Sequence, residues 1–320
     1  MNLDARLIKQ AWTAPAALIA AILLGFASSI FIILQARLIS QVIGRVHTGG
    51  ESLAHVTPFM VWLLAVIAGR TLLAILAEGA AAAVAIRVKH HLRQVLAQHL
   101  FELGPSYVQG QHSGELSAVL NDGVEALDAY FSQYLPQLVL GAAIPLSILV
   151  VAFPLDLLTG FVLLVTTPLI PVFMVLIGKA GERLTRRQWT TLSYMSAYFL
   201  DTLQGLTTLK LLGRSQARMG EIAKVSESYR LATMQVLRVT FLSAFALELA
   251  AAISTAVVAV QIGLRLLAGN IAFETGFFLL LLAPEYYQPL RLIGQRFHAG
   301  MAGVSAAARI FEILDAGTGA

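Results

Sequence analysis

The chain has 320 residues, of which 58% are hydrophobic and 12% are charged, with a net charge of +4 at pH 7. Soluble domains carry about 25% charged residues, so this composition excludes an ordinary soluble protein. The sequence contains no cysteine, which excludes disulfides, thiolate metal sites and redox chemistry by thiols of this chain. Long apolar runs satisfy their backbone groups in lipid as helices, which predicts an all-α membrane protein.

The hydrophobic pattern predicts six membrane-spanning helices. A hydrocarbon core about 30 Å thick requires about 20 apolar residues of helix. The first predicted span is longer than the apolar part of a secretory signal peptide and further spans follow it, so we interpret it as a retained anchor. The predicted spans are 14–43, 58–80, 129–153, 157–178, 239–266 and 273–296.

Two connections between the spans are long and polar, whereas the other three are short. The helix that begins near Pro58 continues past its span to Leu103, where Gly104–Pro105 ends it. At 1.5 Å per residue this helix is roughly 70 Å long, so it must project well beyond the bilayer. The fourth helix also continues into a charged extension, and the fifth begins near Gln216 and stays polar until Arg238.

The distribution of cations predicts the orientation in the membrane. Lysines and arginines that flank spans concentrate on the cytoplasmic side, which places both long connections and both termini inside. The same rule and anionic lipid explain the basic run 179–187 better than nucleic acid does. The cations of the two long connections are Arg87, Lys89, Arg93, Lys179, Arg183, Arg186, Arg187, Lys210, Arg214, Arg218, Lys224, Arg230 and Arg238.

Three segments carry a resemblance to a known family. SGELSAVLNDGVEALDAY, from Ser113, and GLTTLKLLGR, from Gly205, look like the two cytoplasmic coupling segments of an ABC exporter, and AAARIFEILD looks like the linker that precedes its ATPase domain. Within that family, YLPQLVLGAAIPL, TTPLIPVFMVLIG and LAPEYYQPLRLIGQRFHAG are similar to the CydD-type subunit of the heterodimeric CydDC exporter.

The resemblance implies an exporter transmembrane domain over residues 1–315, with 316–320 as the start of a linker. It also implies a bacterial inner-membrane location, a CydC-like partner subunit, and ATP with Mg²⁺ bound on an ATPase domain outside this sequence. The printed sequence has no G-x-x-x-x-G-K-[ST] motif, the loop that cradles the phosphates of ATP. By resemblance, contact with the ATPase domains falls to Glu115, Leu116, Asn121, Leu206, Leu209 and Leu212.

The last predicted helix carries a polar stripe. Tyr287, Arg291, Gly294 and His298 are spaced four, three and four residues apart, which places them on one helix face. The resemblance implies a thiol or haem cargo, with His298 as an axial ligand of haem iron. The alternative is that Arg291 and His298 sit at the membrane edge, where such side chains reach towards water without binding a ligand.

Ionisable residues within spans are candidate functional residues, because an unpaired charge at the bilayer centre costs about 2.5–3.5 kcal/mol. Arg70 and Glu248 are predicted to lie deepest, and they could pair across helices in a structural role. Alternatively, Arg70 and Arg37 could attract a substrate carboxylate. The five such residues are Arg37, Arg70, Glu78, Glu248 and Glu285.

The sequence therefore predicts the transmembrane subunit of an ATP-driven exporter of glutathione, cysteine or haem, linked by resemblance to cytochrome bd assembly. Two alternatives stay open. One is a lipid or peptide exporter of the same fold, which would have little use for Arg70 or Arg291. The other is a membrane haem protein that does not transport, which would need paired axial ligands near mid-bilayer.

Overall fold

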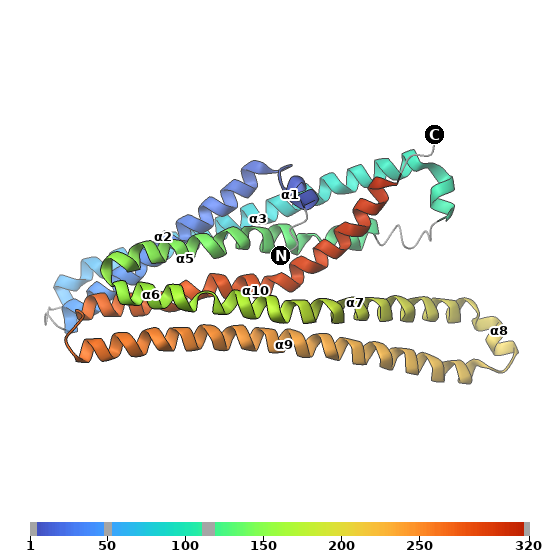
Figure 1. Ribbon diagram of the computed structural model, residues 1–320. Coiled ribbons are helices and arrows are strands. Elements are labelled where there is room, and N and C mark those ends of the chain that lie inside the picture. The colour runs from blue at the N-terminus through green and yellow to red at the C-terminus, as the bar shows by residue number, and fades with distance from the viewer. Residues whose placement is uncertain (1–4, 48–52, 111–118, 317–320) are drawn as a thin grey trace. The chain divides into compact units, whose positions relative to one another are not determined.

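The computed structural model describes residues 5–47, 53–110 and 119–316, and these form helices and turns without a β-strand (Figure 1). Within these ranges a few side chains, that of His298 among them, are not described. In chain order the helices are α1 (Ala5–Ala11), α2 (Pro15–His47), α3 (Leu53–Gly110), η1 (Val119–Gly123), η2 (Tyr130–Tyr134), α5 (Leu135–Leu155), α6 (Leu157–Thr166), α7 (Leu169–Gln204), α8 (Leu206–Leu211), α9 (Ser215–Leu267) and α10 (Phe273–Asp315).

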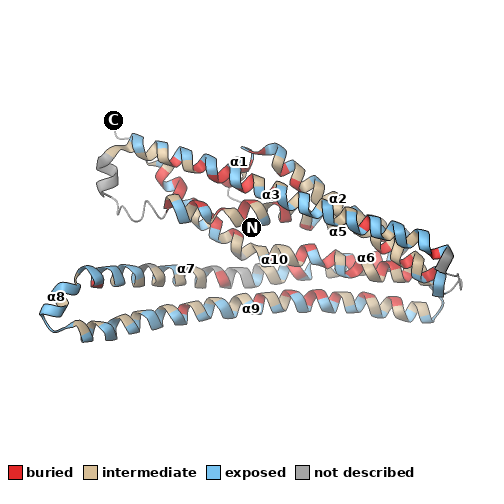
Figure 2. Ribbon diagram, turned by 180° about the vertical axis from the view of Figure 1, so that it is seen from behind, coloured by how far each residue is buried: buried red, intermediate tan, exposed pale blue. Residues whose placement is uncertain are grey.

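Five helical segments are long and apolar enough to cross a membrane, namely 15–47, 55–104, 130–155, 157–174 and 215–267. Large apolar side chains on them are exposed, for example Leu23 on α2 and Trp62 and Leu72 on α3, as expected of surfaces that face lipid (Figure 2). The sixth predicted span lies in α10, as expected. That helix does not reach the same hydropathy, because charged residues such as Glu285 and Arg291 interrupt it.

The fourth predicted span, 157–178, is broken near its middle. α6 ends at Thr166 and α7 begins at Leu169, with Thr167 and Pro168 between them. Proline has no N–H to donate to the carbonyl four residues earlier, so Pro168 interrupts the hydrogen-bond ladder. The fourth predicted span is therefore formed by α6 and the first part of α7.

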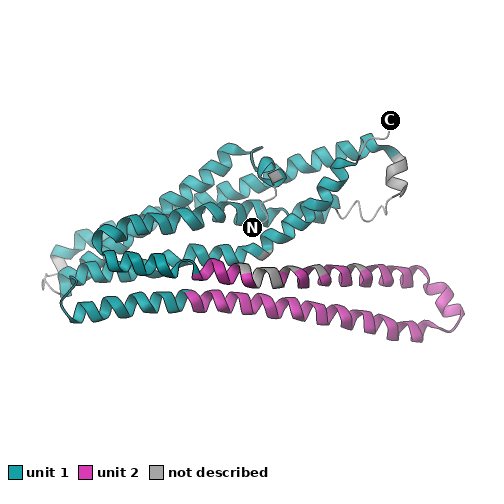
Figure 3. Ribbon diagram, viewed as in Figure 1, with its two compact units in different colours: residues 1–168, 251–320 teal, residues 169–250 magenta. Residues whose placement is uncertain are grey.

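The break at Pro168 coincides with a boundary between two compact units (Figure 3). Unit 1 comprises residues 1–168 and 251–320, and unit 2 comprises residues 169–250. The second boundary falls at Ala250, inside the long helix α9.

Unit 1 is held together by a core between α1, α3, η2 and the last part of α10. From α3 it takes Val84, Val88, Leu92 and Leu96, which recur every four residues and so form one stripe of the helix. η1 and η2 are π-helical turns, which are rare and frequently mark functional sites. The aromatic side chains of η2 are fully buried in the same core, together with Leu7 of α1 and Ile310 of α10.

Close packing of α10 against α5 and η2 depends on small residues. A Cβ atom on Gly141 of α5 would lie 2.1 Å from Cδ1 of Ile293, and one on Gly300 of α10 would lie 2.7 Å from the Tyr134 ring. At Gly300 a larger residue would meet the Tyr134 ring, whereas at Gly141 the nearest atom is the end of the Ile293 side chain, which can move aside.

Unit 2 consists of α7, α8 and the part of α9 up to Ala250. The segment GLTTLKLLGR contains the short helix α8, which Gly205 precedes and Gly213 follows with a positive φ of 67°. Gln188 of α7 donates a hydrogen bond to Thr233 of α9 at 3.0 Å.

The predicted bounds of the other helices agree with the structure only in part, because α3 begins at Leu53 rather than near Pro58 and continues past Leu103. Gly104 interrupts α3 with a positive φ of 77°, a conformation that glycine adopts without steric cost, although helical structure resumes beyond it to Gly110. The connection before the fourth span is short, as predicted, and consists of Asp156 between α5 and α6. The last helix ends at Asp315, as expected.

Candidate functional site

An ion pair between α3 and α10 lies within the predicted spans. Arg70 Nη2 lies 3.6 Å from Glu285 Oε1, and Arg70 Nη1 donates a 3.0 Å hydrogen bond to Oε1 of Gln35 on α2. The side chains of Arg70 and Glu285 are 31% and 27% exposed. Glu285 therefore replaces Glu248 as the expected partner of Arg70.

A second ion pair joins α2 to the first turn of α10. Arg37 Nη2 lies 3.6 Å from Glu274 Oε1, and the Arg37 guanidinium lies 5.6 Å from the centre of the Phe278 ring. Ser40 of α2 donates a hydrogen bond to the main-chain carbonyl of Glu274. Both predicted arginines of α2 and α3 thus meet a carboxylate of α10.

The Tyr286–Tyr287 pair of α10 is fully buried and faces α6. The hydroxyl of Tyr287 hydrogen-bonds with Thr166 Oγ1 at 2.6 Å, and that of Tyr286 with Thr167 Oγ1. These contacts fasten α10 to the end of α6. Tyr287, predicted as a ligand contact, has its phenol engaged within the protein.

Sequence reasoning missed a polar contact between α5 and α10. Gln137, which is buried, donates to the main-chain oxygen of Pro289 at 2.9 Å, and Arg296 donates to Gln137 Oε1 at 2.9 Å. The sequence signal that could have revealed this contact is the amide of Gln137 inside a strongly apolar run. Such a group needs a hydrogen-bond partner when it is buried in lipid.

The other residues of the predicted ligand stripe follow Tyr287 along α10. Arg291 is partly buried and Gly294 is buried, whereas the side chain of His298 lies outside what the structure describes. Glu248 is exposed on the part of α9 that belongs to unit 2. The structure therefore brings together Arg70, Glu285 and Gln35, and separately Arg37 and Glu274. Their ligand roles stay predictions.

An ionic cluster outside the predicted spans joins α3 to the turn before η2. Lys89 Nζ lies 2.8 Å from Glu125 Oε1 and 2.6 Å from Asp128 Oδ1, and Arg93 lies 2.9 Å from Glu125 Oε2. The hydrogen bond from Lys89, followed by that from Arg93, holds the pKa of the Glu125 carboxyl below its usual value. Because Lys89 is largely buried, this cluster has a structural role.

A further ionic cluster closes the turn between α5 and α6. Arg265 of α9 donates to both carboxylate oxygens of Asp156, at 2.7 and 2.9 Å, while Asp156 also accepts from Thr159 N at 3.0 Å and so caps α6. The hydrogen bond from Arg265 lowers the pKa of Asp156, and Thr159 adds to the effect against the opposing effect of burial.

Of the predicted contacts with an ATPase domain, Glu115 and Leu116 lie outside the described residues. Asn121 is exposed in η1. On unit 2, Leu206 and Leu212 are exposed, at 41% and 69%, and Leu209 between them is partly exposed. These leucines lie on α8 and directly after it, where the chain reverses direction, and their exposed side chains are accessible to a partner.

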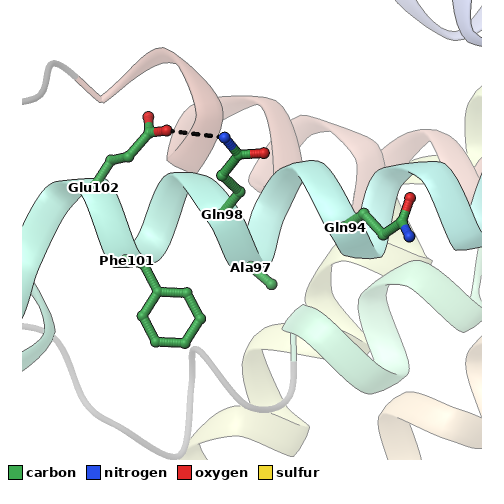
Figure 4. A pocket seen from close by; sticks show the side chains of 5 residues that line it. All are labelled: Gln94, Ala97, Gln98, Phe101 and Glu102. Carbon is green, nitrogen blue, oxygen red and sulfur yellow. Dashed lines mark hydrogen bonds between the residues drawn. The ribbon is translucent and has the colours of Figure 1, made fainter.

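Two surface hollows lie away from the ion pairs of the membrane helices. One is lined by side chains of α3 alone, from Gln94 to Glu102, with Gln98 donating to Glu102 at 3.2 Å (Figure 4). The other lies where Arg6 of α1 meets Asp315 of α10, at 2.6 Å. Among the described residues, no group of three or more histidine, aspartate or glutamate side chains is placed to hold a metal ion.

Comparison with known proteins gives a consistent picture. Residues 15–288 match the family model described as the ABC transporter transmembrane region. The chain is 37% identical over 305 residues to the transport ATP-binding protein AarD of Providencia stuartii, covering 92% of this chain and 51% of that protein. It is 34% identical over 296 residues to the glutathione/L-cysteine transport system ATP-binding/permease protein CydD of Escherichia coli, covering 89% and 50%.

A relative with the name CydC matches to the same degree as CydD. The glutathione/L-cysteine transport system ATP-binding/permease protein CydC of Bacillus subtilis is 34% identical over 283 residues, covering 88% of this chain and 50% of that protein. The chain thus spans about half the length of the curated relatives it matches.

Proposed function

Because the chain belongs to the family of ABC transporter transmembrane regions, we propose that it is the membrane half of an ATP-driven exporter of glutathione or L-cysteine. The observation that carries the cargo class is identity of 34–37% over about nine tenths of the chain to relatives that include glutathione/L-cysteine transport proteins. The proposed location is the bacterial inner membrane, with both termini in the cytoplasm.

The ion pairs of the membrane helices support a charged cargo. Arg37 and Arg70 lie on helices whose other surfaces are strongly apolar, and both guanidinium groups are partly accessible. Such charges are costly in lipid unless they are paired or face a polar cavity. Glutathione and cysteine carry carboxylates, and the guanidinium of Arg70 would hold one of them.

The proposed transporter needs parts beyond this chain. A second, CydC-like half-transporter would enclose the cavity, and ATP with Mg²⁺ would bind to the ATPase domains. Closure of those domains would act on η1 and its neighbouring segment in unit 1 and on α8 in unit 2. Asn121, Leu206, Leu209 and Leu212 would receive that movement, because they are accessible in the described structure.

Haem is the second cargo that the family resemblance implies, together with a link to cytochrome bd assembly. Of the residues predicted for it, Tyr287 does not fit, because its phenol is buried and hydrogen-bonded to Thr166. Haem is therefore tested as a competing cargo in the experiment below.

The experiment uses the full-length protein and its partner subunit in inverted membrane vesicles. We expect uptake of labelled glutathione and cysteine that requires ATP and disappears when the ATPase domains are inactivated. Uptake of haem but of neither thiol would overturn the proposal in favour of a haem exporter. Uptake of a labelled fatty acid alone would favour a lipid exporter. A haem spectrum without transport of any compound would favour a membrane haem protein.

A further inference from the structure

Three arginine–carboxylate pairs in unit 1 differ in how fully their hydrogen-bonding capacity is used. Arg265 contacts both oxygens of Asp156, and Thr159 donates to the same carboxylate, whose side chain is 9% exposed. The Asp156 carboxylate is therefore fully hydrogen-bonded and largely buried. It has the geometry of a structural contact.

The Arg70–Glu285 pair is different. Its 3.6 Å separation exceeds the 2.7–3.2 Å of an N–H···O hydrogen bond, so the two groups attract without hydrogen-bonding. Within the described part of the chain, Arg70 donates one side-chain hydrogen bond, to Gln35, and Glu285 accepts none. A guanidinium has five donors and a carboxylate about four acceptor sites, so both groups keep capacity for a ligand.

The surroundings make this unused capacity costly in the absence of a ligand or water. Both residues lie within helices predicted to span the bilayer, where a charge with unmet hydrogen bonds is expensive. Both remain about three tenths exposed, so a small molecule has access to them. A ligand could therefore replace the weak contact between Arg70 and Glu285 by two stronger contacts, one to each residue.

Charge balance identifies the class of ligand. The pair carries no net charge, so a zwitterion can place its carboxylate on Arg70 and its ammonium on Glu285 without adding charge to the membrane interior. A simple carboxylate would occupy Arg70 and leave the charge of Glu285 uncompensated within a membrane span, which is unfavourable. A fatty acid or a haem propionate is such a carboxylate.

We propose that Arg70, Glu285 and Gln35 form the site that recognises the α-ammonium and α-carboxylate groups. L-cysteine and the γ-glutamyl end of glutathione share this pair of groups. The inference rests on the proposed function and identifies the part of the cargo molecule that this site would bind. Gln35 holds the Arg70 guanidinium in position, since its amide oxygen accepts from Nη1.

The Arg37–Glu274 pair has the same 3.6 Å separation but a different setting, which makes it a matched control. Glu274 lies in the first turn of α10, where the helix dipole stabilises a carboxylate, and Ser40 bonds to its main chain. Arg37 lies over the Phe278 ring. Glu285, in the middle of α10, has none of these supports.

The first test needs no variant. In vesicles that contain the full-length protein and its partner, unlabelled cysteine should compete with uptake of labelled glutathione. Two analogues should compete at least about tenfold less well, because each lacks one charge-assisted contact. They are 3-mercaptopropionate, which lacks the ammonium group, and cysteamine, which lacks the carboxylate. Equal competition by all three compounds would overturn the inference.

The second test is the neutral double variant Arg70→Gln/Glu285→Gln, which keeps hydrogen-bonding amides and leaves no lone charge. We expect its KM for glutathione to rise about tenfold or more and the preference for cysteine over the two analogues to vanish. Arg37→Gln/Glu274→Gln should keep that preference. A double variant with wild-type KM and preference contradicts the inference while leaving thiol export intact. Absence of thiol uptake by the wild type overturns the proposed function itself.

Discussion

Arg265 near the end of α9 donates to both carboxylate oxygens of Asp156, the residue that separates α5 from α6. This pair ties three helices of unit 1 together at one end. The Asp156 side chain is 9% exposed, so its removal would leave the guanidinium without its main acceptor.

Asp156→Asn should destabilise the protein by about 1–3 kcal/mol, the cost of leaving the partly buried Arg265 guanidinium without its charged partner. The thermal unfolding midpoint of the purified transporter, measured with and without the substitution, checks this. Asp122→Asn is the control, because Asp122 is exposed in η1. An equal midpoint shift in both variants would show that the Arg265 contact has no special weight.

The same carboxyl gives a pH dependence of defined sign. Arg265 lowers the pKa of Asp156 in the folded protein, so its contribution to stability is present above the unfolded-state pKa of about 3.9. That contribution is lost as the pH falls through the lower, folded-state pKa. The midpoint difference between wild type and Asp156→Asn should thus be constant from pH 7 to about pH 5 and disappear only in stronger acid. A difference that already vanishes between pH 7 and pH 6 would contradict the assignment to Asp156.

Two glycines provide a matched pair for the packing of α10. A Cβ on Gly303 would lie 3.0 Å from Tyr130 Cβ and 3.1 Å from the main-chain oxygen of Ala126, whereas a Cβ on Gly79 would meet nothing within 4 Å. Gly303→Ala should therefore cost about 1–3 kcal/mol, because main-chain atoms cannot easily move aside. Gly79→Ala should be neutral or stabilising by a few tenths up to about 1 kcal/mol. Thermal unfolding and the transport rate measure both, and equal stability of the two variants would show that α10 and η2 are less closely packed.

The leucines around α8 test the coupling role that the family resemblance assigns to them. Leu209→Ala/Leu212→Ala in the full-length protein should leave basal ATP hydrolysis within about twofold and lower glutathione-stimulated hydrolysis and transport several-fold, because truncated interface side chains typically cost about 1–2 kcal/mol each. Leu231→Ala is the control, since Leu231 is also exposed but lies on α9. Unchanged transport per ATP in the double variant would remove α8 from the coupling path.

Much of the fold could be predicted because apolar length determines membrane helices. Five of the predicted spans coincide with helical segments that are long and apolar enough to cross a membrane. α9 ends shortly before Gly269, and α10 ends at Asp315 after a charged segment. Pro168 lies within the fourth predicted span, where a proline is expected to kink the helix, but packing decides that the helix breaks there into α6 and α7.

The sequence predicted which residues belong to the candidate site, but it did not predict which carboxylate each arginine contacts. Ionisable residues are easily recognised within apolar runs of sequence, so the sequence alone identified Arg37, Arg70 and Glu285 as candidates. Their partners depend on which faces of α2, α3 and α10 meet, and hydropathy carries no information about that. For this reason Glu248 was expected beside Arg70, where the structure has Glu285.

The central claim is that this chain forms the membrane path of a thiol exporter. Its most direct test is the initial rate of ATP-driven uptake of labelled glutathione into inverted vesicles that contain the full-length protein and its partner, with excess unlabelled cysteine, haem or palmitate as competitor. Uptake should be saturable, and cysteine should suppress it whereas palmitate should not. No ATP-dependent uptake, or uptake that only haem or palmitate suppresses, would contradict it.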